Sequence, residues 1–189
     1  ANADLIIEAD TSIMITGVTI DIDGGNADAS MAFNSSGGAH ASAIVELDAG
    51  TTVGIIATGA LTIDGGNASA DAFSNSTASA TAHAGVEIYT GGPSGGDITL
   101  TGTTVTIVGG SADAYASAGE FGSATAGVEI DADHSVIVNA TAGNASFNGG
   151  TASASGGASA HANAGVELNG LSGGVFATGA LWAFMPCGL

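Results

Sequence analysis

The sequence contains no lysine and no arginine, although it has 18 acidic residues, so its formal net charge is −18. Nucleic-acid binding depends on basic side chains that neutralise phosphates, and attachment to anionic membranes depends on a basic patch. Both partners are therefore excluded. A substrate carboxylate or phosphate also cannot be clamped by arginine. Trypsin-like proteases find no cleavage site, which suits an extracellular or cell-surface location.

Cysteine and long apolar runs are equally scarce. Cys187 is the only cysteine, so no disulfide can form within one chain, and its thiol is either buried or paired with a second molecule. No run of 18 apolar residues occurs, so we expect no membrane-spanning helix. The chain begins Ala1-Asn2-Ala3 without methionine, as a cleaved mature protein or an excised fragment would.

Charged residues make up only 10% of the chain, which instead contains 32 glycines and many alanines. Disordered chains combine high charge with few β-branched residues. Here, runs such as Ile13-Met14-Ile15 and Val136-Ile137-Val138 strongly favour β-strands. The composition therefore predicts an ordered all-β protein.

A short motif, clearest at Gly85-Val86-Glu87-Ile88, recurs along the chain. Close copies follow it and looser ones precede it: Gly127-Val128-Glu129-Ile130, Gly165-Val166-Glu167-Leu168, Ile44-Val45-Glu46-Leu47 and Ile6-Ile7-Glu8-Ala9. The successive glutamates are 38, 41, 42 and 38 residues apart. A nearly fixed period is typical of a repeat architecture, in which each copy buries its apolar face against the next. We predict a single parallel β-solenoid (β-helix) domain over residues 1–189, with about five repeats of ~40 residues.

Each period has the same internal order. The glutamate strand is followed by a polar turn, a second strand, a short break and a third strand, which ends in the first four copies at a Gly-Gly pair (24–25, 65–66, 109–110 and 149–150). The rest of the period alternates alanine with polar residues. A spacing of two predicts strands whose alanines share the buried face with the motif's valine and isoleucine. Alanine is also the best helix former, but this spacing argues against helices.

The pattern leaves two coil sizes open. Coils of about 20 residues would stack alanine strands on valine-rich strands. A coil of one whole period, about 40 residues, would stack each segment on its own counterpart. We favour the larger coil because it explains why each segment keeps a separate identity. Its short stack would have nearly bare ends, and bare ends of a parallel sheet invite end-to-end addition of another chain.

The recurring glutamates are the candidate binding residues. Their side chains share the outward face, and in the larger coil four of them form one column of like charges: Glu46, Glu87, Glu129 and Glu167. Cations would relieve this repulsion, and carboxylate oxygens suit Ca²⁺. The alternative is a solvated acidic stripe. No cofactor is required by the sequence, and Ca²⁺ is the one that this column would bind.

Other chemistry is weakly supported. His40, His83 and His161 precede their glutamates by 6, 4 and 6 residues, but a zinc site needs three or four convergent ligands. The turns after Asp23 and Asp64 share only glycines with the calcium repeat of RTX proteins. The acids are spread regularly, and no G-x-S-x-G elbow occurs. We therefore expect no enzymatic activity.

Two surface features suggest other partners. Thr19, Thr62 and Thr106 recur once per period and resemble a thin version of the threonine arrays on ice-binding solenoids. Glycans are a further expectation, because in a secreted protein N-x-S/T sequons can carry them. Five sequons occur, beginning at Asn34, Asn67, Asn75, Asn139 and Asn144.

The last ten residues, 180–189, differ from everything before them. They contain the only tryptophan, Trp182, within an apolar stretch, and no alanine alternation follows. Solenoids commonly end in a capping element. We predict that this segment is either an apolar cap on the last coil or a tail that docks into a neighbouring subunit.

One stretch resembles a known family. Gly96-Asp97-Ile98-Thr99-Leu100-Thr101-Gly102-Thr103-Thr104-Val105-Thr106 is similar to the repeats of filamentous-haemagglutinin-type adhesins, which two-partner systems secrete and which fold as right-handed parallel β-helices. Looser copies lie at Val53–Asp64 and Ile13–Asp23. The alanine alternation and the lack of lysine and arginine depart from that pattern, and no secretion-domain motif is present. The resemblance implies a secreted, surface-associated, non-enzymatic β-helix.

These patterns together predict a structural subunit of an extracellular filament, sheath or surface layer. Its partner would be a second copy of the same chain, added by end-to-end stacking. One alternative is a fragment of a long cell-surface adhesin that contacts glycans or a cell surface. A second alternative is an ice-binding solenoid.

Overall fold

The computed structural model describes residues 1–31, 37–73, 78–92, 96–117, 121–156, 159–171 and 173–184. These residues form strands and no helix, and they include no helix that could cross a lipid bilayer. The strands are β1 (Leu5–Ala9), β2 (Ser12–Gly17), β3 (Ile20–Asp23), β4 (Asn26–Met31), β5 (Gly37–Ala49), β6 (Thr52–Ala57), β7 (Leu61–Asp64), β8 (Asn67–Ala72), β9 (Ala78–Thr90), β10 (Asp97–Gly102), β11 (Val105–Val108), β12 (Ser111–Ala116), β13 (Phe121–Ala132), β14 (Ser135–Asn148), β15 (Thr151–Ser155), β16 (Ser159–Gly170) and β17 (Gly174–Phe184).

The strands form three parallel sheets. The long sheet has the order β1-β5-β9-β13-β16, and the alanine sheet has the order β4-β8-β12-β15. The bent sheet runs β2-β6-β10-β14-β11-β7-β3, and β17 also pairs with β14. Each segment pairs with its counterpart one period away, as Val45 does with Val86 and Val86 with Val128. The fold is therefore a parallel β-solenoid whose coil is one whole period, as predicted.

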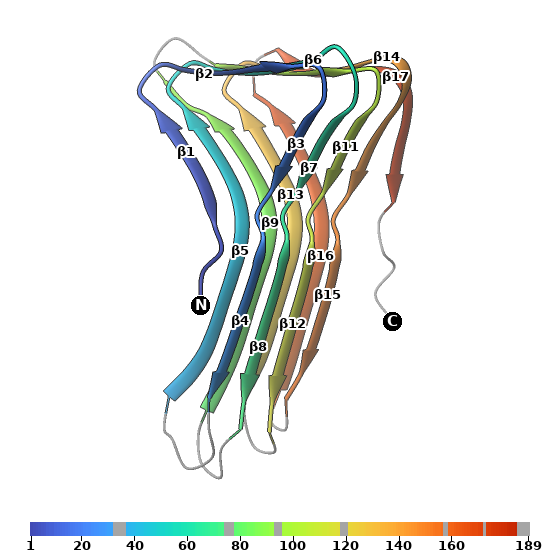
Figure 1. Ribbon diagram of the computed structural model, residues 1–189. Helices are drawn as coiled ribbons and strands as arrows, with labels where there is room; N and C mark the ends of the chain where they lie inside the picture. Colours follow the sequence, from blue (N-terminus) through green and yellow to red (C-terminus); the bar gives the residue numbers. More distant parts are fainter. Residues whose placement is uncertain are drawn as a thin grey trace.

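Each coil has a wedge-shaped outline. It rises along the long sheet and crosses at the wide end through β2, β6, β10 or the first part of β14. It returns through β3, β7, β11 or the last part of β14 into the alanine sheet (Figure 1). One core of Val, Ile and Leu, with five alanines and a single Phe, Phe147, fills the wide part. A second core consists almost entirely of alanine and lies between the alanine sheet and the N-terminal halves of β5, β9 and β13. Small side chains let the two sheets converge there, since interiors must be close-packed.

The Gly-Gly pairs lie where the bent sheet passes into the alanine sheet. A Cβ added at Gly109 would lie 2.6 Å from the carbonyl carbon and oxygen of Gly127, and Gly65 meets Gly85 at the same distances. The first glycine of each pair therefore allows backbone to touch backbone. The second has a positive φ, as at Gly110 (75°), which L side chains rarely adopt.

Three sequence expectations are corrected by the strand register. Glu8 pairs with Asp48, and Ile6 is the residue opposite Glu46, so the first copy of the motif is offset by two residues. Asp21, not Thr19, pairs with Thr62, which removes the predicted threonine column. The order of segments in each period predicts separate second and third strands, which in the fourth copy would be Ser135–Asn139 and Ala145–Asn148. They belong to one strand, β14, and the expected strands Val175–Thr178 and Leu181–Phe184 likewise belong to one strand, β17; the two pair with a register shift at the corner.

The C-terminal segment is a strand as far as it is described. Residues 180–184 complete β17, and Leu181 pairs with Ala145 in β14. Residues 185–189, including Cys187, lie outside the described residues. Whether they cap the last coil or dock into a neighbour stays a prediction.

Candidate functional site

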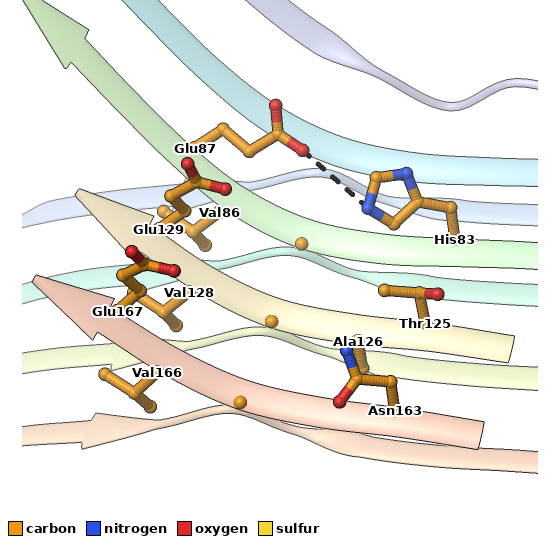
Figure 2. Close-up of a pocket in the computed structure, with 13 residues that line it drawn as sticks. His83, Val86, Glu87, Thr125, Ala126, Val128, Glu129, Asn163, Val166 and Glu167 are labelled. Atoms are coloured by element: carbon orange, nitrogen blue, oxygen red, sulfur yellow. Dashed lines mark ion pairs between the residues drawn. The ribbon is translucent and has the colours of Figure 1, made fainter. Parts of the chain in front are cut away.

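A shallow groove crosses β9, β13 and β16 on the outer face of the long sheet (Figure 2). Its volume is about 220 Å³, smaller than the roughly 300–1,000 Å³ typical of small-molecule sites. The groove could hold a row of hydrated ions or a thin extended chain. Gly85, Gly127 and Gly165 form its floor, the carboxylates of Glu87, Glu129 and Glu167 line one side, and His83, Thr125 and Asn163 line the other.

The groove exists because a glycine column lies between two columns of larger side chains. Gly85, Gly127 and Gly165 pair in register across the three strands. Ile44 occupies this column in β5, and its Cγ2 lies 4.0 Å from the Cβ position of residue 85. A Cβ at Gly165 would meet no atom within 4 Å. The groove is therefore closed toward β5 and open at β16.

The four glutamates predicted as a cation column do lie in one column. Glu46 pairs with Glu87, Glu87 with Glu129 and Glu129 with Glu167. Burial raises the pKa of the Glu46 carboxyl, and the neighbouring acids, first Glu87 and then Glu8, raise it further. Within the described ranges, no group of three or more His, Cys, Asp or Glu side chains is arranged to hold a metal ion. Calcium binding by this column stays a prediction.

Neighbouring polar side chains contact two of these carboxylates. Tyr89 donates its hydroxyl to Glu87 Oε2 at 3.5 Å, and Asn169 Nδ2 donates to Glu167 Oε1 at 2.8 Å. His83 Nε2 lies 3.7 Å from Glu87 Oε1 (Figure 2). Burial, followed by the charges of Glu87 and Glu129, raises the pKa of Tyr89. Its phenol therefore remains a protonated donor at neutral pH.

A second column of polar residues was missed from the sequence. It lies two positions further along the same face and consists of Glu8, Asp48, Tyr89, Asp131 and Asn169. The available signal was a polar residue two positions after each of the last four motif glutamates, because such residues share the face of the glutamate. The outer side of the long sheet is therefore a double acidic stripe interrupted by Tyr89 and Asn169.

The histidines do not form one column. His40 pairs with Thr81 and His161 with Ser123, whereas His83 pairs with Thr125. The spacings of six and four residues place them two positions apart on the same face. A metal column built from His40, His83 and His161 is therefore ruled out by the register.

Asp97 is the centre of a separate polar cluster. Its Oδ1 accepts hydrogen bonds from Ser135 Oγ and from His134 Nδ1, the latter at 2.7 Å. In a serine hydrolase the histidine lies between the serine and the acid, whereas here both side chains contact the acid directly. The bonds from Ser135, and then from His134, lower the pKa of Asp97. The cluster joins β10 to β14 and does not form a nucleophilic triad.

The two shifted carboxyls predict opposite pH dependences. Glu46 has a raised folded-state pKa, so its contribution to stability is complete below its ordinary value of 4.5 and is lost as the pH rises through the folded value. The pKa of Asp97 is lowered, so its contribution is present above 3.8 and is lost as the pH falls further. In thermal unfolding, Glu46→Gln should gain less stability on acidification than the parent gains. Asp97→Asn should weaken only the loss at lower pH, and profiles parallel to the parent would contradict the assignment.

Three of the five sequons lie in the described residues. Asn144 is exposed, and Asn67 Nδ2 donates to Asn26 Oδ1 at 2.8 Å on the surface. Asn139 Oδ1 accepts a hydrogen bond from Thr178 Oγ1 at 2.7 Å. Asn34 and Asn75 lie outside the described residues.

Comparison of the chain with protein-family models, curated proteins and solved structures found no match.

Proposed function

We propose that the chain is a structural subunit of an extracellular filament, sheath or surface layer, built by stacking identical copies coil on coil. The observation that supports this most directly is the state of the sheet edges. β1, β2, β3 and β4 are the outermost strands at one end of the solenoid, and β15, β16 and β17 at the other. In the described part of the chain, no helix lies over either end. Such edges carry backbone donors and acceptors that can pair with another chain.

The side-chain core is also partly uncovered at both ends, although Ile13, Ile20 and Ile22 of the first coil are buried. Val136 is fully buried, whereas its neighbour in the same column, Val175, is 42% exposed. At the opposite end, Val45 is fully buried and its neighbour Leu5 is 37% exposed. Another coil would remove this apolar surface from water, which contributes roughly 25 cal/mol per Å².

The parallel pairing makes the two ends complementary. Every coil pairs with the next in one direction, so an added copy can continue the same parallel ladder. A contact between two different surfaces of identical subunits can be repeated from copy to copy. It generates a ring if the rotation between copies closes, and a filament if it does not. The acidic stripe would then run along the side of the filament, where Ca²⁺ could neutralise it.

A fragment of a long adhesin remains the second candidate, because further coils of one chain would cover the same edges. The resemblance around Gly96–Thr106 supports it. An ice-binding face is less well supported, because Asp21 and Ser146 interrupt the column that contains Thr62 and Thr106.

Electron microscopy of the purified chain tests the proposal. We expect filaments one coil wide that lengthen with protein concentration, and we expect Ca²⁺ to raise the melting temperature. If only monomers are seen both in EDTA and with calcium, self-assembly is wrong. If the melting temperature is the same in EDTA as in calcium, bridging of the glutamate column by cations is wrong, whatever the assembly state.

A further inference from the structure

We infer that the copies join head to tail, with the nearly uncharged end of one copy packed on the acidic end of the next. This inference rests on the proposed self-assembly and adds the polarity and the register of the contact. The acidic edge is defined here as β1, β2, β3 and β4, and the neutral edge as β15, β16 and β17.

The acids are distributed unevenly along the solenoid axis. Glu167 is the only acid after Asp133, and it is the only one on the neutral edge. The first coil carries six of the 18 acids: Asp4, Glu8, Asp10, Asp21, Asp23 and Asp28. Two acidic edges brought together would place these charges against one another, and directly opposed like charges are destabilising. An acidic edge meeting a neutral edge avoids this.

The internal register, extended by one coil, predicts which residues meet in the long sheet. Leu5 occupies the same column as Val45 and Val166. Addition of the next copy therefore places its Ile6 against Glu167 and its Glu8 against Asn169. A carboxylate meets an apolar side chain in one column and an amide donor in the other.

Facing pairs of acids do occur between neighbouring coils of the chain, so their absence at the junction between copies is not automatic. Five pairs of acids lie directly opposite one another inside the solenoid: Glu8–Asp48, Glu46–Glu87, Glu87–Glu129, Glu129–Glu167 and Asp23–Asp64. In the register described above, the long and bent sheets bring no acid against an acid at the junction. The contact between copies therefore has less repulsion between opposed carboxylates than the contacts between coils.

The bent sheet supplies an apolar match at the same junction. Phe176 is 56% exposed on the neutral edge and Met14 is 60% exposed on the acidic edge. Both belong to one outer column of the bent sheet. From one coil to the next, this column contains Met14, Gly54, Thr99, Ile137 and Phe176. Head-to-tail stacking places the ring on the thioether, a favourable sulfur–aromatic contact. Thr178 then faces Thr16 in the next column.

A disulfide across the junction tests polarity and register together. In a Cys187→Ser background, Thr16→Cys and Thr178→Cys would lie about 4.8 Å apart between stacked copies, within the Cα range of disulfides. Inside one copy, three strands separate them, which is about 19 Å. We expect mild oxidation of the double variant to give a ladder of covalent dimers, trimers and longer chains. The matched control, Thr16→Cys with Thr101→Cys, should give no ladder because Thr101 lies in an internal row of the same column.

The single variants distinguish the possible polarities. If Thr16→Cys alone or Thr178→Cys alone forms covalent dimers rapidly, like ends meet and the inference is wrong. Filaments without a ladder would also overturn it while leaving the proposed function intact. A chain that neither assembles nor cross-links would overturn both.

Charge at the junction provides an independent readout. Asn169→Asp would face Glu8 of the next copy, and Asn169→Lys would attract it. We expect the critical concentration for assembly to be about threefold to tenfold higher for the aspartate variant than for the lysine variant at low salt. At high salt the critical concentrations of the two variants should become equal. Asn148→Asp lies in β14, one strand inside the neutral edge, and should leave the critical concentration unchanged. Equal values for the two Asn169 variants at low salt would contradict the register.

Discussion

Replacement of Gly109 with alanine should lower the free energy of unfolding by about 3 kcal/mol or more. The added Cβ would lie 2.6 Å from the carbonyl carbon and oxygen of Gly127, a distance that Cβ atoms in proteins essentially never show to non-bonded atoms. Backbone, unlike the end of a long side chain, cannot move aside. The bent and long sheets would have to separate at the place where they converge. Denaturant unfolding followed by circular dichroism measures the loss.

The partner glycine provides the matched control. A Cβ at Gly127 points to the outer groove, where its nearest neighbour is the Gly165 carbonyl oxygen at 3.5 Å. Gly127→Ala should therefore change the free energy of unfolding by about 0.5 kcal/mol or less. If Gly109→Ala and Gly127→Ala lower the free energy of unfolding by similar amounts, the close approach of the two sheets is not the reason that position 109 requires glycine.

Enlargement of the alanine core should have the second largest effect. Ala126 is 1% exposed and lies among the alanines that face the alanine sheet. Ala126→Leu would add three carbons where the neighbouring positions are also alanine, so the packed sheets must part. We expect a loss of about 2–3 kcal/mol.

The adjacent residue in β13 is the control for this substitution. Thr125 lies on the wall of the outer groove, so Thr125→Leu should cost less than about 0.5 kcal/mol. Thermal or denaturant unfolding of the two variants would compare the faces directly. A loss for Thr125→Leu as large as that for Ala126→Leu would contradict the assigned inner and outer faces.

The sequence predicted the period, the parallel stacking and the buried face, and its two errors of register share one physical origin. Glu8 was aligned with Glu46 and Thr19 with Thr62, yet each proves to be two positions out of register. A strand alternates faces every residue, so a shift of one position is readily detected. A shift of two keeps every side chain on its own face, and the pattern of buried residues cannot detect it.

The site was predicted only in part for a related reason. The glutamate column followed from the motif, because four copies of one residue recur at the coil period. The groove beside it depends on a glycine column flanked by His83, Thr125 and Asn163, three different residue types with no common spacing signal. The wedge shape was equally inaccessible, because alternation states which alanines are buried but not which sheet they pack against.

The uneven distribution of acids has a consequence for the whole assembly. Each solenoid carries an electric dipole along its own axis, with the negative pole at the first coil. Stacking in one direction adds these dipoles, so the two ends of an assembly differ in charge however long it grows. A positively charged surface would then hold the negative pole and leave the other end free, which sets the direction in which the assembly extends from that surface.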